Sequence, residues 1–354
     1  MGYHALKKKA FLTTAAVTGI TMLFPALCMA ASEKDIQTYT DTDFAMDTVV
    51  SETLYTTGDD INSKLTSVLT DVETNLLSWT NEKSQIYKVN ADSGKDTEIS
   101  EELSGYLERL LKIAKDSDGV FDPTIGKLIR LWDIGGENQR IPGEDEIQEV
   151  LKDSGYQKIS LDGNTIHMDE GCSLDLGAAG KGIGCDLILE NLKNQKDVTA
   201  ALMNLGGSSV MTYGSKPDGS SWNVAVTDPR AENDDDYLGV VALNGTEFLS
   251  TSGDYEKYFI EDGVRYHHIM DPSTGYPAKS GVTGVTVVCD TGLEADALST
   301  ACFVLGVEKG AQLLKTYGAD GLFVDEDHHV YLTEGMKERF SLLADSYGVE
   351  DIIE

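Results

Sequence analysis

The sequence predicts an α+β fold whose second half is rich in strands. Apolar residues recur at helical spacing before Lys115, whereas short alternating and β-branched runs dominate after Ala200. Helical and strand-like segments in separate runs are typical of the α+β class. The 354 residues show no internal repeat and no long linker, so they fill one large domain or two modest ones.

The N-terminus has the pattern of an export signal. Three lysines, Lys7 to Lys9, precede an apolar stretch that ends at Cys28-Met29-Ala30, where small residues suit cleavage. An uncleaved membrane anchor is the alternative because the apolar stretch is long; lipidation of Cys28 is a third, which Leu27 disfavours. We expect an exported, extracytoplasmic protein, secreted or held at the outer face of the membrane. The predicted boundaries are a signal peptide or anchor at 1–30, a tether at 31–43, a domain at 44–345 and a C-terminal tail at 346–354.

The formal net charge of −32 excludes some partners. Such a surface repels nucleic acid and anionic lipid, so we exclude a nucleic-acid function. A pyrophosphate ligand would also be repelled unless a divalent cation or local positive charge offset the field. Any phosphate chemistry here therefore favours a bound metal.

The first half predicts helices with a few short extended pieces. Thr48 to Thr56 alternates like a strand, and the apolar spacing from Ile61 to Leu77 predicts a helix that ends near Trp79. A second helix is expected from Glu101 to Lys115, with Ser100 as its N-cap. We further expect an extended piece at 84–90, a helix at 144–152, and a hairpin formed by 158–161 and 165–168 around Asp162-Gly163-Asn164.

The second half predicts a series of strands followed by two helices. The strand-like runs are 200–205, 209–213, 222–226, 238–243, 247–251, 255–260, 265–270 and 282–289. Helices are expected from Leu293 to Leu305 and from Glu308 to Tyr317, and a last hairpin surrounds the loop 325–329. The cysteines beyond Cys28 lie beside strand or helix patterns and show no metal-binding spacing, so we expect buried thiols.

The stretch 173–186, SLDLGAAGKGIGCD, combines a strand, a glycine-rich turn and a helix that starts near Gly180. Glycines allow close approach to the main chain, a helix N-terminus offers N–H groups to an anion, and Lys181 adds positive charge. These features suit a phosphate or pyrophosphate. A tight connection with glycines for packing is the alternative, since the spacing fits neither common nucleotide-binding motif.

Two further segments carry candidate chemistry. Asp296 and Thr300 lie four residues apart at the start of a helix, so they share one helix face, and their oxygen atoms suit Mg²⁺. The alternative is that Asp296 stabilises the helix start and Thr300 only packs against its neighbours. His267 and His268 end a strand, which turns them to opposite faces, so that one can enter a cleft as a base or phosphate ligand. A surface histidine beside the following turn is equally compatible. The acidic runs 233–236 and 325–329 lack EF-hand spacing and are read as solvated loops.

Six segments, in this order, resemble the ApbE family of FAD:protein FMN transferases from about Phe44 to Tyr331. They are FDPT at 121–124, DLG at 175–177 with Lys181-Gly182, NLGG at 204–207, TSGDY at 251–255, HIMDP at 268–272 with Thr274-Gly275, and ADALST at 295–300. The resemblance implies two closely packed subdomains with mixed or antiparallel sheets and FAD in the cleft between them. It also implies a Mg²⁺-dependent enzyme that transfers FMN from FAD to a Ser or Thr hydroxyl of a target protein and releases AMP. The target it implies is a membrane redox subunit.

The resemblance also implies roles for individual residues. Asp296 and Thr300, with the carbonyl of Ala178, match the Mg²⁺ ligands, and His268 and Asp296 match positions of catalytic importance. Residues that match flavin-nucleotide contacts are Met46, Trp79, Val120, Phe121, Asp122, Asp175, Lys181 and His268.

Three positions depart from the family pattern. Asp47 stands where Gly usually follows the Met, Ser299 stands where some members have an acid, and Trp79 replaces a Tyr. Two other functions use the same features: an enzyme that hydrolyses FAD to FMN and AMP, and an extracytoplasmic FAD-binding protein without activity.

Overall fold

The computed structural model describes residues 35–231, 233 and 236–351 of the chain. The expected signal or anchor at 1–30 lies outside these residues. Residues 36–351 belong to one compact unit. Among the residues that the structure describes, no helix has the length and apolarity needed to cross a membrane.

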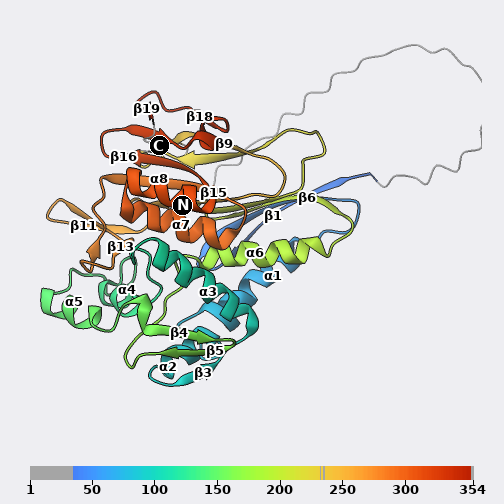
Figure 1. The fold of residues 1–354 in the computed structure, drawn as a ribbon. Helices are drawn as coiled ribbons and strands as arrows, with labels where there is room; N and C mark the ends of the chain where they lie inside the picture. Colours follow the sequence, from blue (N-terminus) through green and yellow to red (C-terminus); the bar gives the residue numbers. More distant parts are fainter. Residues whose placement is uncertain (1–34, 232, 234–235, 352–354) are drawn as a thin grey trace, which may run out of the picture. The chain divides into compact units, whose positions relative to one another are not determined.

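A nine-stranded mixed sheet forms the centre of the fold (Figure 1). Neighbouring strands are antiparallel, except for the last pair, β17 and β19, which is parallel. In spatial order the strands are β1 (Gln37–Ala45), β2 (Thr48–Thr56), β6 (Val198–Leu205), β7 (Ser209–Tyr213), β10 (Phe248–Gly253), β15 (Val282–Cys289), β16 (Asp320–Asp325), β17 (His329–Leu332) and β19 (Gly348–Asp351).

Helices cover one face of this sheet and a small sheet covers the other. All eight residues of β15 are buried, because Val285 and Val287 join the core under the helices while Val288 joins the core on the opposite face. The covering helices include α1 (Asn62–Val72), α6 (Gly180–Lys193), α7 (Gly292–Leu305) and α8 (Val307–Tyr317). The opposite face carries the sheet of β8 (Trp222–Thr227), β9 (Tyr237–Leu243) and β18 (Phe340–Leu342), with α9 (Glu334–Lys337) nearby.

A smaller group of elements lies beside the helical face. Helix α3 (Glu101–Asp116) begins at Ser100, whose hydroxyl accepts the N–H of Leu103 at 3.1 Å, as an N-cap should. The remaining elements are η1 (Glu73–Leu77), α2 (Gln85–Ala91), β3 (Asp96–Glu98), α4 (Gly126–Trp132), α5 (Glu144–Leu151), η2 (Tyr156–Lys158), β4 (Ile159–Asp162) and β5 (Thr165–Met168). Two short hairpins, β11 (Tyr258–Glu261) with β12 (Val264–His267) and β13 (Met270–Asp271) with β14 (Tyr276–Pro277), follow β10 in the chain.

The expected α+β class is confirmed, and so are most elements. Several predictions differ from the structure. The strand expected at 265–270 is interrupted, because β12 ends at His267 and β13 begins at Met270 in a separate hairpin. Residues 37–43, expected in a tether, belong to β1; the tail residues 348–351 form β19; residues 85–91 are helical rather than extended; and Ser173 to Leu176 makes only one bridge, to Ile125, rather than a strand. The four cysteines in the described residues are buried free thiols, as predicted.

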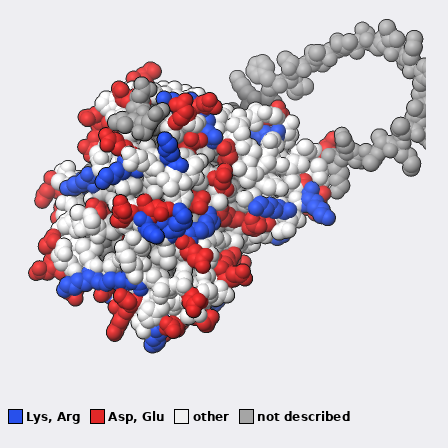
Figure 2. All heavy atoms as spheres, in the orientation of Figure 1, with Lys and Arg blue, Asp and Glu red and all other residues white. Residues whose placement is uncertain are grey.

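Both signs of charge occur on the surface. On the face that Figure 2 shows, Asp and Glu side chains are spread widely, with Lys and Arg side chains among them. The acidic composition is therefore distributed over many elements on this face.

Candidate active site

Helices α6 and α7 touch through their first turns. A methyl group at Gly182 would lie 2.0 Å from the carbonyl oxygen of Gly292, and one at Gly292 would lie 2.2 Å from the carbonyl oxygen of Gly182. Only glycine leaves room for two backbones at this separation. The contact places Asp296, one turn into α7, against the N-terminus of α6.

The carboxylate of Asp296 is buried and hydrogen-bonded on both oxygens. Oδ2 accepts the N–H of Gly182 at 2.9 Å, and Oδ1 accepts the hydroxyl of Ser209 at 3.2 Å. Burial raises the pKa of Asp296, while the charge of Lys181 and the hydrogen bonds lower it. Within the described ranges Asp296 forms no ion pair, so Lys181 acts on its charge without a direct contact.

Thr300 follows Asp296 by one turn on the same helix face. Its hydroxyl lies 3.4 Å from the carbonyl oxygen of Asp296 and 3.3 Å from the hydroxyl of Ser252 on β10. Ser299 is fully buried and bonds both Ser252, at 2.8 Å, and the carbonyl of Asp296, at 2.8 Å. Where the resemblance places an acid in some relatives, this chain therefore has a hydroxyl that fixes β10 against α7.

Oxygen atoms of the predicted metal ligands meet the requirements of a hard cation. Asp296 offers a carboxylate and Thr300 a hydroxyl; within the described part of the chain no N–H donates to the carbonyl of Ala178. Mg²⁺ binds such oxygens and keeps waters or substrate phosphates as further ligands. The donor set, together with a buried carboxylate that forms no ion pair within the described residues, fits Mg²⁺.

Lys181 brings the second glycine-containing turn, at 204–208, into the site. Its ammonium donates a short hydrogen bond to the hydroxyl of Ser208. The N–H of Thr251 donates to the carbonyl of Ser208 at 2.7 Å, which joins this turn to β10. One cation and several hydroxyls therefore surround Asp296, a set that suits an anionic substrate.

His268 comes directly after β12, and His267 points the other way. Nε2 of His267 lies 3.0 Å from the carbonyl oxygen of Ala278 in the core, whereas Nδ1 of His268 lies 3.3 Å from the carbonyl oxygen of Lys257. Burial lowers the pKa of His268 to about 4, and the charges of His267, Lys257 and Lys181 act in the same direction. The imidazole is therefore neutral at pH 7, the state in which it can accept a proton.

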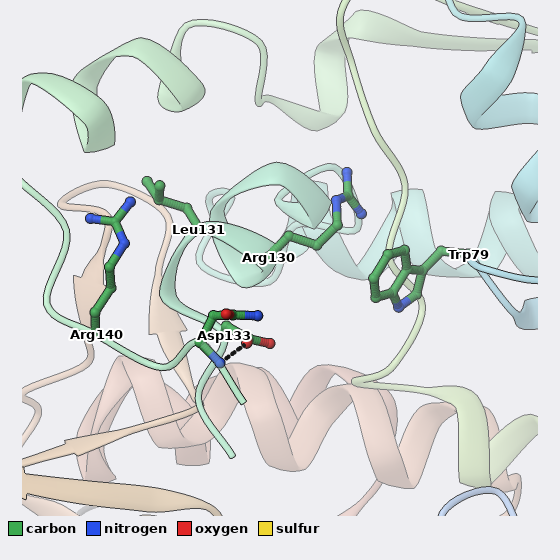
Figure 3. Close-up of a pocket in the computed structure, with 6 residues that line it drawn as sticks. Trp79, Arg130, Leu131, Asp133 and Arg140 are labelled. Carbon is green, nitrogen blue, oxygen red and sulfur yellow. Dashed lines mark hydrogen bonds between the residues drawn. The ribbon is translucent and has the colours of Figure 1, made fainter. Parts of the chain in front are cut away.

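A cavity of about 300 Å³ lies beside Trp79 and α4. Figure 3 shows Arg130 extending toward the Trp79 ring, with Arg140 on the other side of Leu131. The guanidinium carbon of Arg130 lies 5.0 Å from the ring centroid, a cation–π arrangement. The cavity combines an aromatic face with positive charge, which suits a planar ring or an anion.

Asp175 links this cavity to the glycine-rich turn. Its Oδ1 accepts the N–H of Gly177 at 2.8 Å. Burial raises the pKa of Asp175, and the N–H of Gly177 and the charge of Arg130 oppose that change. Arg130 also donates to the hydroxyl of Ser173 at 2.5 Å. Sequence reasoning missed Arg130, although a single arginine inside the apolar segment 128–132 was a usable signal.

Met46 lies at the turn between β1 and β2, over the start of α6. Its N–H donates to a carboxylate oxygen of Glu73 at 3.0 Å, and its side chain lies near Gly180 and Gly184. Met46 and Asp47 both have left-handed backbone, with φ of 53° and 58°. A glycine at position 47 would adopt this conformation without strain, which accounts for the residue that the family pattern has there.

The loop next to Asp175 contains half-buried Val120 and buried Phe121 and Asp122. The N–H of Asp175 donates to the carbonyl of Pro123 at 2.9 Å. Both carboxylate oxygens of Asp122 accept hydrogen bonds, from Thr124 at 2.8 and 2.6 Å and from the N–H of Tyr156 at 3.0 Å. Asp122 therefore stabilises the loop, and its contact with a nucleotide, like those of Val120 and Phe121, stays a prediction.

The glycines of the stretch 173–186 have more than one role. Gly182 packs on Gly292, and a methyl group at Gly184 would lie 2.7 Å from Leu69 and 3.1 Å from Met46. The N–H of Gly182 already binds Asp296, so it is not free for a phosphate as the sequence suggested. The packing alternative thus holds for Gly182 and Gly184, whereas Gly177 is exposed beside Asp175.

The acidic loop after β16 offers a weaker candidate. Ligand atoms of Asp325, Asp327 and His329 lie within 4.8 Å of one another. The carboxylate of Asp325, however, accepts the N–H groups of Asp327 and His329 and the hydroxyl of Tyr331. These hydrogen bonds cap the turn of the hairpin that the sequence predicts around 325–329.

Comparison with known proteins gives a family match over most of the chain. The model of the ApbE family matches residues 46–323. The FAD:protein FMN transferase of Treponema pallidum (strain Nichols) is 35% identical over 285 residues, which are 76% of this chain and 78% of the relative.

Solved structures agree with this match. The ApbE protein of Thermotoga maritima superposes with a TM-score of 0.77 at 34% identity and covers 86% of this chain and 99% of its own. The apo form of the flavinyl transferase ApbE from Pseudomonas stutzeri superposes with a TM-score of 0.75 at 29% identity, over 87% and 98% of the two chains. The similarity therefore extends over nearly all of the described fold.

Proposed function

This chain belongs to the ApbE family, and we propose that it is an exported FAD:protein FMN transferase that depends on Mg²⁺ and modifies a Ser or Thr hydroxyl. The observation that carries the proposal is the grouping of Asp296, Thr300 and Lys181 at the contact between α6 and α7. A buried acid without a direct ion pair in the described residues, and a lysine among hydroxyls, suit a metal-bound diphosphate.

In this proposal FAD is the substrate and supplies the transferred group. The acceptor oxygen forms a bond to the phosphorus of the FMN half, the bond from that phosphorus to the bridging oxygen breaks, and AMP leaves. Lys181 holds phosphate oxygens, and neutral His268, or a nearby acid, takes the hydroxyl proton. Mg²⁺, held by Asp296, Thr300 and the carbonyl of Ala178, would neutralise charge on the diphosphate.

Two surfaces are candidates for the ring systems of FAD. Met46 covers the start of α6, while Trp79 stacks with Arg130 at the cavity shown in Figure 3. Both side chains present apolar surface to which a planar ring can bind. We assign the isoalloxazine and adenine rings to these two surfaces together, without choosing which ring binds which.

The location and the acceptor are further parts of the proposal. Lys7 to Lys9, the apolar stretch and the small residues before Ala31 support export to the extracytoplasmic side. The acceptor, by resemblance, is a membrane redox protein that presents a Ser or Thr. Anchoring of this chain to the membrane would bring the two together.

The test is intact-mass analysis of a candidate acceptor domain after incubation with the protein and FAD, with Mg²⁺ or with chelator. We expect a Mg²⁺-dependent gain of one FMN on a Ser or Thr, and its loss in Asp296→Ala. FMN and AMP released with no acceptor gain, for several acceptors, would indicate FAD hydrolysis instead. FAD bound tightly but intact in every tube would indicate a binding protein and contradict the proposal.

A further inference from the structure

Helices α6 and α7 exchange capping carboxylates. Asp186 lies four residues after Gly182 on α6, just as Asp296 lies four residues after Gly292 on α7. Oδ1 of Asp186 accepts the N–H of Gly292 at 2.7 Å, and Oδ2 accepts the N–H of Leu293 at 3.1 Å. Each helix therefore carries the acid that satisfies N–H groups at the start of the other.

The two acids differ in their cations. Asp186 lies 3.9 Å from a guanidinium nitrogen of Arg109, which also contacts Glu294 at 3.5 Å and the hydroxyl of Thr291 at 2.5 Å. A protein cation thus compensates the charge of Asp186. Asp296 has no such ion pair within the described ranges. The hydrogen bonds and the ion pair of Asp186 need no ligand. They can therefore hold the start of α7, and with it Asp296, in place.

We propose that Asp186 is a positioning residue for the cation site, an inference that rests on the metal role proposed for Asp296. Its two hydrogen bonds hold the first turn of α7 against α6. Because a helix moves as a rigid element over a few turns, a shift of Gly292 and Leu293 carries Asp296 and Thr300 with it. Asp186 itself is none of the proposed metal ligands or FAD contacts; its partners are Gly292, Leu293 and Arg109.

The test compares Asp186→Ala and Asp186→Asn with the parent protein. The alanine variant loses both acceptors, whereas asparagine keeps one oxygen that can accept an N–H. Changes in residues that orient metal ligands cost about 10–100-fold in metal affinity or activity. Because Asp186 acts through the backbone of α7, we expect Asp186→Ala to raise the Mg²⁺ concentration for half-maximal transfer about tenfold, and Asp186→Asn to raise it less. The rate at saturating Mg²⁺ should stay near that of the parent.

A binding measurement separates this effect from activity. Mn²⁺ binding in the presence of FAD can be followed by electron paramagnetic resonance. The Mn²⁺ dissociation constant should be lowest for the parent, higher for Asp186→Asn and highest for Asp186→Ala. Glu190→Ala is the matched control: it removes one acid from an exposed position one turn further along α6, where the Glu190 side chain pairs with Lys193. We expect no change in that variant.

Unchanged metal dependence in a folded Asp186→Ala protein would overturn the inference. If that variant does not fold, Asp186→Asn decides in its place, and unchanged half-saturation there overturns the inference equally. A parent protein whose transfer ignores Mg²⁺ would instead contradict the proposed function, so the two failures are distinguishable.

Discussion

Replacing Gly182 by alanine tests the contact on which the site depends. The added methyl carbon would lie 2.0 Å from the carbonyl oxygen of Gly292 and 2.9 Å from Cβ of Asp296. Since real Cβ contacts start at 3.0 Å, the two helices must separate by at least 1.0 Å, the difference between 3.0 and 2.0 Å. The same shift stretches the 2.9 Å hydrogen bond from Gly182 to Asp296 beyond hydrogen-bonding distance.

The expected magnitude follows from opposing terms. Overpacking costs about 1–3 kcal/mol, and loss of a buried hydrogen bond adds about 1 kcal/mol or more. The higher helix propensity of alanine offsets about 1 kcal/mol of this loss of stability. We therefore expect Gly182→Ala to lower the free energy of unfolding by about 1–3 kcal/mol and to raise the Mg²⁺ concentration for half-maximal transfer.

Urea unfolding and a Mg²⁺ titration of transfer are the assays. Gly105→Ala on α3 is the control, because a methyl group there meets nothing within 4 Å; it should raise stability by about 0.5–1 kcal/mol. If Gly182→Ala were as stable as the parent and kept its metal dependence, the two backbones would not be in the contact described. Equal effects of the two substitutions would likewise refute the reasoning.

Two further predictions concern the ends of the site. Asp47→Gly should raise the free energy of unfolding by up to about 1 kcal/mol, because relief of the left-handed strain at φ 58°, about 1–2 kcal/mol, exceeds the entropy that glycine adds to the unfolded chain, about 0.5–1 kcal/mol. Urea midpoints measure this, and a loss of stability would contradict it. For His268 the folded-state pKa, about 4, lies below the ordinary 6.5, so the unfolded chain binds the extra proton between these values. Stability should therefore fall as pH drops from about 6.5 to about 4, and less so in His268→Gln. Parallel pH curves for the two proteins would refute this.

The strong periodicities of the sequence predicted most of the fold, and the failures have physical causes. Residues 37–44 are mostly polar and, apart from half-buried Tyr39, exposed on both faces, so only pairing with β2 makes them a strand. Residues 85–91 contain Ile86 and Val89, which favour strands, yet both are buried three residues apart on one helix face. In each segment a distant partner overrides local preference.

The candidate site was predictable as a set of residues but not as a set of contacts. Asp296, Thr300 and Lys181 were identified from their types and spacing, and the structure brings them together. The glycines looked like ligand-binding residues because Gly292, the packing partner of Gly182, lies far away in the chain. Asp186 was missed, although Gly-x-x-x-Asp occurs at both 182–186 and 292–296 and could have linked the two helices.

The glycine pair also restricts how this region can change by mutation. Glycine is the smallest residue, so no substitution at either Gly182 or Gly292 can make room for a side chain at the other position. Once one methyl group has parted the helices, a second enters a gap that is already open. The double substitution should therefore cost less than the two separate costs combined, a coupling expected of residues in direct contact. Relatives that lose one glycine would be free to lose the other, and the two positions should vary together.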